Sequence, residues 1–252
     1  MLQKFYPHVL LINVPKNVLN LYKKEIGNQG SQVVMIPIDA QYKIAKEEMS
    51  MRYLVVSDIH GEFYKLEEVL QDASFDSKED QLILLGDYID RGPYSREVVA
   101  KVRELVEKQG AIAIKGNHDD LFIRSKDDEE AMNLWEMNGA SSTLKSYNGV
   151  SKEMKEHREW LENHLRLYYE TDQYIFVHAG LEPNVPLDEQ KEDIMLWTRH
   201  TETIGLGKTV VHGHTPVHNI AYYKDQIDID TGAAYGGKLT LLELPTHEVY
   251  TA

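Results

Sequence analysis

The chain contains no cysteine, and this absence excludes disulfide bonds, thiolate metal ligands and a cysteine nucleophile. It also makes the cytoplasm the expected compartment, since secreted proteins of this size often carry disulfides. No uninterrupted apolar run approaches the roughly 20 residues of a membrane span. The longest candidate, residues 8–21, is broken by Asn13, Pro15 and Lys16 and lacks the small-residue cleavage pattern of a signal peptide.

Basic residues are also in short supply. The 252 residues hold 27 Lys and Arg against 41 Asp and Glu, a formal net charge of -14. A field of this sign repels a nucleic-acid backbone, so we expect no duplex-binding face. A bound divalent cation would offset part of the charge locally. Hydrophobic residues make up 42% of the chain, enough for the packed core of one α/β domain or two small ones.

Residues 1–50 differ from the rest of the chain. They carry six Lys and four acidic residues and no chemical motif, whereas residues 51–252 hold most of the negative charge. Two interpretations stand side by side. The codons of Lys46-Glu47-Glu48 can contain a purine-rich ribosome-binding sequence, so that the working protein begins at Met49 or Met51. Alternatively, residues 1–50 are a genuine N-terminal extension.

From Met51 onward, short apolar runs alternate with amphipathic segments. Strands are predicted first at residues 53–57, 81–85 and 111–114, and helices at residues 62–70, 95–108 and 151–169. The C-terminal part is rich in predicted strands, at residues 174–177, 209–211, 226–229, 238–244 and 248–250. Alternation of strands and helices with short links implies parallel pairing and an α/β fold.

Polar residues flanked by glycine follow five of these strands. The segments are Ser57-Asp58-Ile59-His60-Gly61, Gly86-Asp87-Tyr88-Ile89-Asp90-Arg91-Gly92, Gly116-Asn117-His118-Asp119, His178-Ala179-Gly180 and His212-Gly213-His214-Thr215-Pro216. Ligands of open α/β sheets bind at the carboxyl ends of the strands. One such residue alone is more often a turn residue or a helix cap. Five strands that each end in such a polar segment predict one shared binding site.

The donor atoms of these segments are carboxylate and amide oxygens and imidazole nitrogens. Such donors suit Mn, Fe, Zn or Co. There are more of them than one tetrahedral ion uses, so two ions are predicted, about 3.5–4 Å apart and bridged by a carboxylate. The six candidate ligands are Asp58, His60, Asp87, Asn117, His178 and His214.

The order Asp-x-His-Gly, Gly-Asp-x-x-Asp-Arg-Gly, Gly-Asn-His, His-Ala-Gly and Gly-His-Thr-Pro resembles that of the calcineurin-like metallophosphoesterases. Its Asp-Arg-Gly points to the PPP-type phosphatases and their bacterial relatives, which include symmetrical diadenosine tetraphosphate hydrolases. The resemblance covers about residues 52–244. It implies a four-layer α/β/β/α sandwich and a bacterial hydrolase with two divalent ions, for which we expect Mn²⁺, with Fe, Zn, Co or Ni as alternatives.

The resemblance also implies a role for each site residue. Asp58 and His60 would bind the first ion, Asp87 would bridge, and the other three ligands would bind the second. His118 would donate a proton, and Asp90 would hold the His118 ring in position. Arg91 matches the phosphate-binding arginine of the family, and Arg199, after Trp197, is the candidate for a second phosphate contact.

Some positions depart from the pattern or stay open. Asp119 stands where many relatives have Glu, and we expect little consequence. Pro216 replaces a possible further His ligand. His212 alternates with His214 and is interpreted as structural. The segment from Trp135 to Leu144 either borders the site or is a plain helix–turn.

The predicted activity is hydrolysis of phosphomonoesters by direct attack of a metal-bridging water, with serine/threonine phosphoproteins as the leading substrate class. The first alternative is a symmetrical bis(5'-nucleosyl)-tetraphosphate hydrolase acting on a small nucleotide. The alternative from another class is an inactive scaffold that binds a protein partner. Such a scaffold would be expected to lose ligands or the proton donor, and this chain has both. The sequence does not define an oligomeric state.

Overall fold

The computed structural model describes residues 51–252. The two interpretations of residues 1–50 therefore lie outside the described residues. None of the helices within residues 51–252 is long and apolar enough to cross a membrane.

One five-stranded sheet has the order β10-β9-β1-β2-β3. The parallel strands β1, β2 and β3 form one half of it, and β9 and β10 join antiparallel on the other side of β1. The bounds are Arg52–Val56 for β1, Asp80–Leu84 for β2, Ile112–Ala113 for β3, Thr240–Leu244 for β9 and Val249–Thr251 for β10.

The second sheet also has five strands, in the order β4-β5-β6-β8-β7. Its central strands β5, β6 and β8 are parallel, and β4 and β7 form antiparallel edges. The bounds are Tyr168–Glu170 for β4, Tyr174–Val177 for β5, Thr209–His212 for β6, Ala221–Tyr222 for β7 and Gln226–Asp228 for β8.

Alternation along the strands assigns their side chains to different layers. In β1, Leu54 and Val56 belong to a core cluster shared with the helices, whereas Tyr53 and Val55 belong to a cluster that also contains Phe176 of β5. Successive side chains of a strand point to opposite faces. The second cluster therefore lies between the two sheets, and each sheet is buried on both faces.

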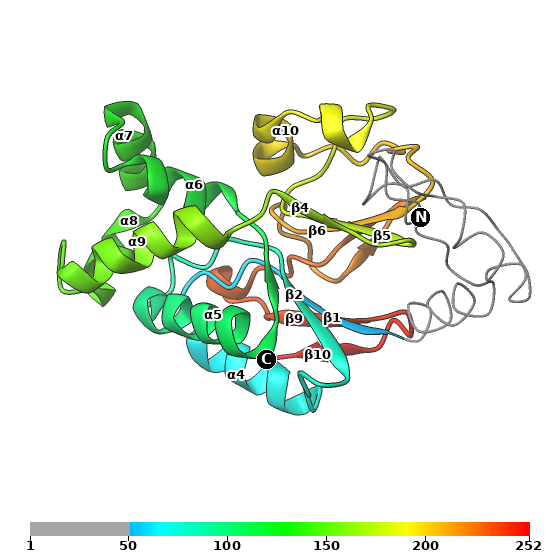
Figure 1. Cartoon of the computed structure of the whole chain (residues 1–252), viewed down its shortest axis with the longest axis horizontal. Coiled ribbons are helices and arrows are strands. Elements are labelled where there is room, and N and C mark those ends of the chain that lie inside the picture. Colours follow the sequence, from blue (N-terminus) through cyan, green and yellow to red (C-terminus); the bar gives the residue numbers. More distant parts are fainter. Residues whose placement is uncertain (1–50) are drawn as a thin grey trace, which may run out of the picture. The chain divides into compact units, whose positions relative to one another are not determined.

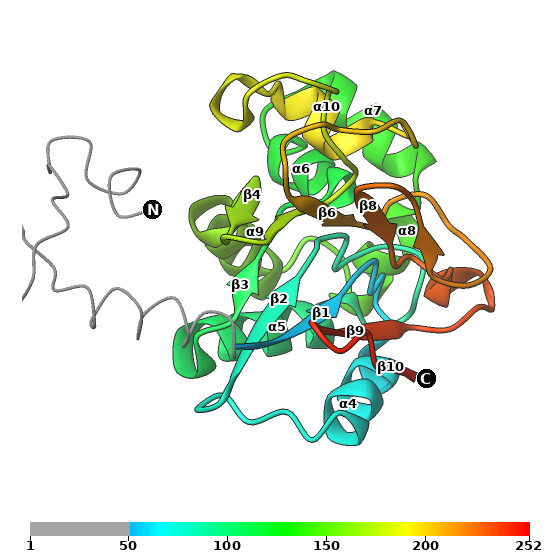
Figure 2. The same ribbon diagram turned by 90° about the vertical axis from the view of Figure 1, so that its right-hand side faces the viewer.

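Helices cover the outer faces. The helices α4 (Phe63–Asp72) and α5 (Ser95–Gln109) pack under the first sheet, and the short helix α10 (Glu192–Trp197) covers the second (Figures 1 and 2). The valines and leucines of α5 recur at helical spacing and are buried, and Gly110 ends the helix in the left-handed conformation. The predicted four-layer α/β/β/α sandwich is confirmed.

Four more helices gather to one side of the sheets (Figure 1). They are α6 (Asn117–Arg124), α7 (Glu129–Met137), α8 (Ala140–Ser146) and α9 (Lys152–His164). The predicted helix over residues 151–169 is wrong in its last part, because the backbone turns extended at Leu165. Arg166 then exchanges backbone hydrogen bonds with the β3 end, and residues 168–170 pair with β5. Tertiary strand pairing here overrides the helical pattern.

Candidate metal centre

The carboxyl ends of strands from both sheets meet at one place. Asp58 follows β1, Asp87 follows β2, and Asn117 follows β3, while His178 and His214 follow β5 and β6. All five side chains are buried, as is that of His60. The structure thus brings together all six predicted ligands, from segments up to 156 residues apart.

Three of these side chains present a compact set of donors. Asn117 Oδ1 lies 2.9 Å from His178 Nε2 and 3.0 Å from His214 Nδ1. Two ligands about 2.1 Å from one ion and at right angles are about 3 Å apart. The three atoms therefore have the spacing of neighbouring ligands on one metal ion.

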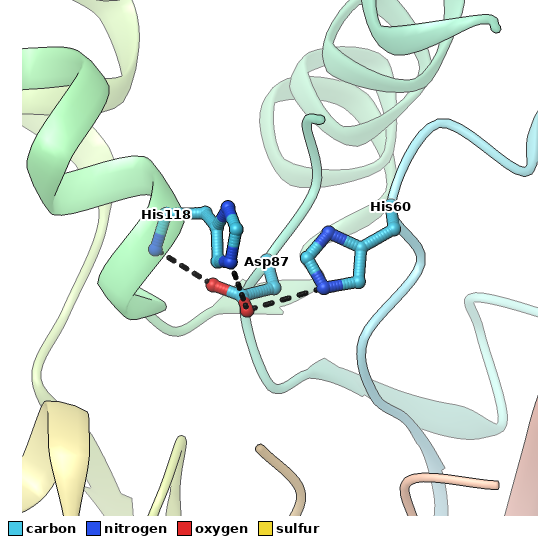
Figure 3. A group of neighbouring side chains, drawn as sticks. All are labelled: His60, Asp87 and His118. Carbon is cyan, nitrogen blue, oxygen red and sulfur yellow. Dashed lines mark hydrogen bonds and ion pairs between the residues drawn. The ribbon is translucent and has the colours of Figure 1, made fainter. Parts of the chain in front are cut away.

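Asp87 lies at the centre of the site. Its Oδ1 is 3.6 Å from His178 Nε2, and its Oδ2 is 3.3 Å from His60 Nε2 and 4.0 Å from His118 Nε2 (Figure 3). Asp87 belongs to both groups of residues that could hold an ion, one with His60 and His118 and one with His178 and His214. Its two oxygens thus face different sides, as a bridging ligand requires.

Backbone carbonyls fix the orientation of two imidazole rings. His60 Nδ1 lies 2.7 Å from the carbonyl oxygen of Ile89, and His178 Nδ1 lies 2.9 Å from that of Leu85. A carbonyl only accepts, so each Nδ1 carries the proton and each Nε2 keeps a lone pair that can accept a hydrogen bond or bind an ion. The two Nε2 atoms lie 3.3 and 3.6 Å from Asp87 oxygens, an arrangement of lone pairs that needs nearby cations, and at His60 the Arg91 guanidinium is one of them. The donor set therefore fits divalent ions.

Asp58 approaches the same site from β1. Its Oδ2 accepts hydrogen bonds from the Ser57 hydroxyl and from the His214 backbone N–H, the latter at 3.0 Å. Both bonds use Oδ2, so Oδ1 is the oxygen that could bind an ion. Ser57 thereby orients the carboxylate, a role that the sequence alone did not suggest.

The carboxylates of the site lie close together in a buried region with few positive charges. Burial, together with the nearby charges of Asp90 and Asp230, raises the pKa of Asp87 to about 8. Burial also raises the pKa of Asp58 to about 6, with Asp87 as a further cause. Anions that repel each other in a buried site are stabilised by bound cations. The electrostatics thus agree with the donor geometry.

A second carboxylate holds His118. Asp90 is fully buried, and its Oδ2 accepts a 2.7 Å hydrogen bond from His118 Nδ1. Trp135 Nε1 donates to both Asp90 oxygens at 3.0 Å, and Thr143 Oγ1 donates to Oδ1 at 2.6 Å. The Trp135–Leu144 segment therefore borders the site and is more than a plain helix–turn. His118 Nε2 is left facing Asp87.

The two candidate arginines lie at different places. The Arg91 guanidinium contacts His60 Nε2 and lies 4.9 Å from the centre of the Tyr235 ring. Arg199 is exposed. Burial lowers the pKa of His214, and the Arg199 charge is among the further causes, so this arginine lies near the second ligand group. The Trp197 ring, 6.0 Å from that of His214, borders the same side.

The backbone of the site is unusual. Ten non-glycine residues among those described have positive φ, and six of these are the site residues Asp58, His60, Asp87, Asp90, Arg91 and His214. Such conformations are costly for residues with a Cβ and cluster at functional sites. Close approach also demands glycine: a Cβ on Gly116 would overlap Asp87, and one on Gly213 would overlap Ser57 and Asp58.

His212 is buried but belongs to neither ligand group, in line with its expected structural role.

Two acidic residues have larger roles at the site than the sequence suggested. Asp230, in the segment after β8, is buried and raises the pKa of Asp87. Asp119 is fully buried and accepts backbone hydrogen bonds from Gly116, Asp87 and Tyr88 at 2.8–3.1 Å. Its position after Asn117-His118 was visible, but its contact with the Asp87 loop depends on the fold.

We expect Asp119→Asn to weaken metal binding. The amide keeps one acceptor oxygen in place of two, so at least one backbone donor at the Asp87 loop loses its partner. Loss of a partner that orients a ligand typically costs about 10–100-fold in metal affinity. Isothermal titration of Mn²⁺ into the metal-free protein measures this loss. Asp120→Asn is the matched control, because Asp120 pairs with Lys115 and Arg124 instead. Equal metal affinity in the two variants would contradict the role of Asp119.

Comparison with known proteins adds independent findings. The calcineurin-like phosphoesterase family matches residues 51–241. The chain is 28% identical over 229 residues to the asymmetrical bis(5'-nucleosyl)-tetraphosphatase PrpE of Oceanobacillus iheyensis, covering 79% of this chain and 90% of that protein. It is 29% identical over 203 residues to serine/threonine-protein phosphatase 1 of Salmonella typhimurium, covering 75% of this chain and 90% of that protein.

Solved structures show the same architecture. One described as a proposed diadenosine tetraphosphatase superposes with a TM-score of 0.63 at 25% identity, over 81% of this chain and 93% of the other. A cold-active protein tyrosine phosphatase gives a TM-score of 0.59 at 17% identity, over 82% of each chain. At that identity the likeness concerns the fold alone.

Proposed function

The chain belongs to the calcineurin-like phosphoesterase family, whose match spans residues 51–241, and from this premise we propose that it is a dinuclear-metal phosphatase acting on phosphoserine and phosphothreonine in proteins. The observation that carries the proposal is the position of Asp87, whose two oxygens face two separate sets of imidazole donors. Two ions held in this way would present the paired positive charge that stabilises a phosphate group.

Each predicted residue receives a role in this proposal. Asp58, His60 and Asp87 would hold one ion, and Asp87, Asn117, His178 and His214 the other. Bound ions would supply Lewis acidity and an acidified water. Because the donors are oxygen and nitrogen atoms, Mn²⁺ is the proposed metal. The bacterial relatives support a bacterial enzyme, and we propose the cytoplasm as its compartment.

The remaining residues act on the phosphate and the leaving group. Arg91 lies beside His60 and would bind a phosphate oxygen, and Arg199 would approach from the side of Trp197. His118 would give a proton from Nε2 to the leaving oxygen, while Asp90 fixes its ring through Nδ1. Trp135 and Thr143 donate hydrogen bonds to Asp90, so a buried hydrogen-bond network fixes the orientation of the proposed proton donor.

A second substrate class has specific support. The PrpE relative and the 25% identical structure are named for dinucleoside tetraphosphates. The exposed rings of Tyr235 and Trp197 lie near Arg91 and His214, where a nucleotide base could stack. The symmetrical hydrolase expected from the sequence and the asymmetrical one named by this relative differ only in which bond is cut.

A panel of substrates with Mn²⁺ tests these proposals. Phosphoserine and phosphothreonine peptides, diadenosine tetraphosphate and phenyl phosphate are compared by kcat/KM. We expect the phosphopeptides to give the highest value. A higher value for diadenosine tetraphosphate would favour the second candidate, and its products would show the bond cut: two ADP for symmetrical cleavage, ATP and AMP for asymmetrical. No turnover of any substrate by protein with two bound ions would support the scaffold alternative.

A shortened chain tests the domain boundary. We propose that residues 51–252 are the catalytic domain, because both sheets and all site residues lie within the described part. A chain beginning at Met51 should fold and keep full activity. Its melting temperature and kcat/KM are compared with those of the complete chain. A large loss of either would show that residues 1–50 belong to the working enzyme.

A further inference from the structure

A cavity lies among the helices α6 to α9, and none of the proposed metal ligands lines it. Its volume is about 780 Å³, within the usual range of small-molecule sites. Met132 and Trp135 of α7, Leu144 of α8 and Met154 of α9 supply an apolar lining. These four helices form the group on one side of the sheets in Figure 1.

One cation in this cavity lacks a full set of partners. The Nε of Arg158 is buried and has no hydrogen-bond partner in the described part of the chain. The Arg158 guanidinium lies 4.4 Å from the centre of the Phe122 ring, and burial lowers its pKa. By contrast, Lys126 in the same cavity is paired with Glu162. Because Arg158 lines the cavity, a carboxylate there could reach the terminal N–H groups of its guanidinium and stabilise this half-buried cation.

The charges around the cavity narrow the choice of ligand. Lys126, Lys155 and Arg158 line it together with Glu159 and Glu162. Two acidic side chains disfavour a dianion such as a phosphate monoester, whereas a single carboxylate matches the guanidinium fork of arginine. The apolar lining calls for an apolar body attached to that carboxylate.

The cavity is also connected to the proposed proton donor. Trp135 of α7 and Thr143 of α8 both donate hydrogen bonds to Asp90, and Asp90 accepts one from His118. The cavity is lined by Trp135 itself and by Leu144, the neighbour of Thr143. A ligand that contacts both helices would therefore restrain both donors to Asp90.

We propose that this cavity binds a small amphipathic carboxylate, with its carboxylate on Arg158 and its apolar body against Met132, Trp135, Leu144 and Met154. Binding clamps α7 against α8 and steadies the Asp90–His118 pair, which increases proton donation to the leaving group. The effect on rate rests on the proposed phosphatase function, whereas binding itself does not.

Calorimetric titration with decanoate tests the binding, using the complete metal-loaded chain. Arg158→Met should raise the Kd about ten-fold or more, because a charge-assisted hydrogen bond is lost. Arg103→Met is the matched control: Arg103 is a half-exposed arginine of α5 that pairs with Glu107 and lies outside the cavity lining, so the Kd should stay within about two-fold. Decan-1-ol, which lacks the charge, should bind the unaltered protein more weakly. An unchanged Kd in Arg158→Met overturns the site.

Two further readouts keep the test decisive if Arg158→Met folds poorly. Decanoate should shift the Trp135 indole N–H resonance of the unaltered protein and leave that of the exposed Trp197 in place, with Trp197→Phe providing the assignment. A shift confined to Trp197 overturns the site. Decanoate should also raise kcat for phenyl phosphate about five-fold, and by less for p-nitrophenyl phosphate. Binding without this difference overturns the coupling, and absence of all turnover would count against the phosphatase function alone.

Discussion

The Asp87→Asn variant is expected to lose affinity for both metal ions and most of its activity. Asp87 is common to both groups of candidate ligands, so removing its charge weakens two ions at once. The loss of metal affinity should exceed the roughly 10–100-fold that is typical when a residue that only hydrogen-bonds to a metal ligand is removed. Metal content after dialysis and kcat/KM on a phosphopeptide measure the two effects.

Asp58→Asn provides the contrast for this experiment, because Asp58 is a proposed ligand of one ion only. It should lower the occupancy of one ion and leave the other near its usual value. In Asp87→Asn, the asparagine has nearly the shape of aspartate and keeps an oxygen that can accept the hydrogen bond from the His118 backbone N–H. The substitution therefore removes the charge and leaves the local hydrogen bond in place. Two retained equivalents of metal and full turnover in Asp87→Asn would show that Asp87 does not bridge.

The His118→Asn variant is expected to keep both ions and to lose activity according to the leaving group. General acid catalysis is worth about 10²–10⁴-fold when the leaving oxygen needs a proton. A serine alkoxide needs one, as does phenolate, whereas p-nitrophenolate leaves readily without it. The loss of kcat should therefore be far larger on a phosphoserine peptide or phenyl phosphate than on p-nitrophenyl phosphate.

His218→Asn is the control for this series, because His218 is exposed and lies outside the ligand groups. Equal losses of kcat across the three substrates would mean that His118 positions phosphate instead of donating a proton. Loss of metal would move it into the ligand set, which its Nε2, 4.0 Å from Asp87 Oδ2, makes a real outcome.

The layers of the fold could be predicted because β strands buried on both faces leave a clear pattern. Short apolar runs such as Leu82–Leu84 and Tyr174–Val177 are visible in the sequence and form central strands. The end of α9 could not be predicted in the same way. Residues 165–169 continue a helical pattern, but they leave the helix because Arg166 pairs with the β3 end. Such long-range pairing has no local signal.

The proposed ligands could be selected for a related reason: each lies in a short polar segment that follows a strand and contains a glycine. The residues that orient them are different. Asp119 holds the Asp87 loop through backbone N–H groups, and Trp135 reaches Asp90 from 45 residues away. Contacts of this kind depend on how helices pack against a sheet. A sequence can show which atoms bind a metal more readily than which neighbours keep them in place.

Titration of the metal-free protein with Mn²⁺, followed by electron paramagnetic resonance, tests the central claim of a dinuclear centre most directly. The account predicts that two equivalents bind per chain. The second should convert the six-line signal of isolated Mn²⁺ into that of an exchange-coupled pair, with hydrolysis rising in step. Full hydrolysis at one equivalent, or two equivalents that give only uncoupled six-line signals, would contradict a pair of ions bridged by Asp87.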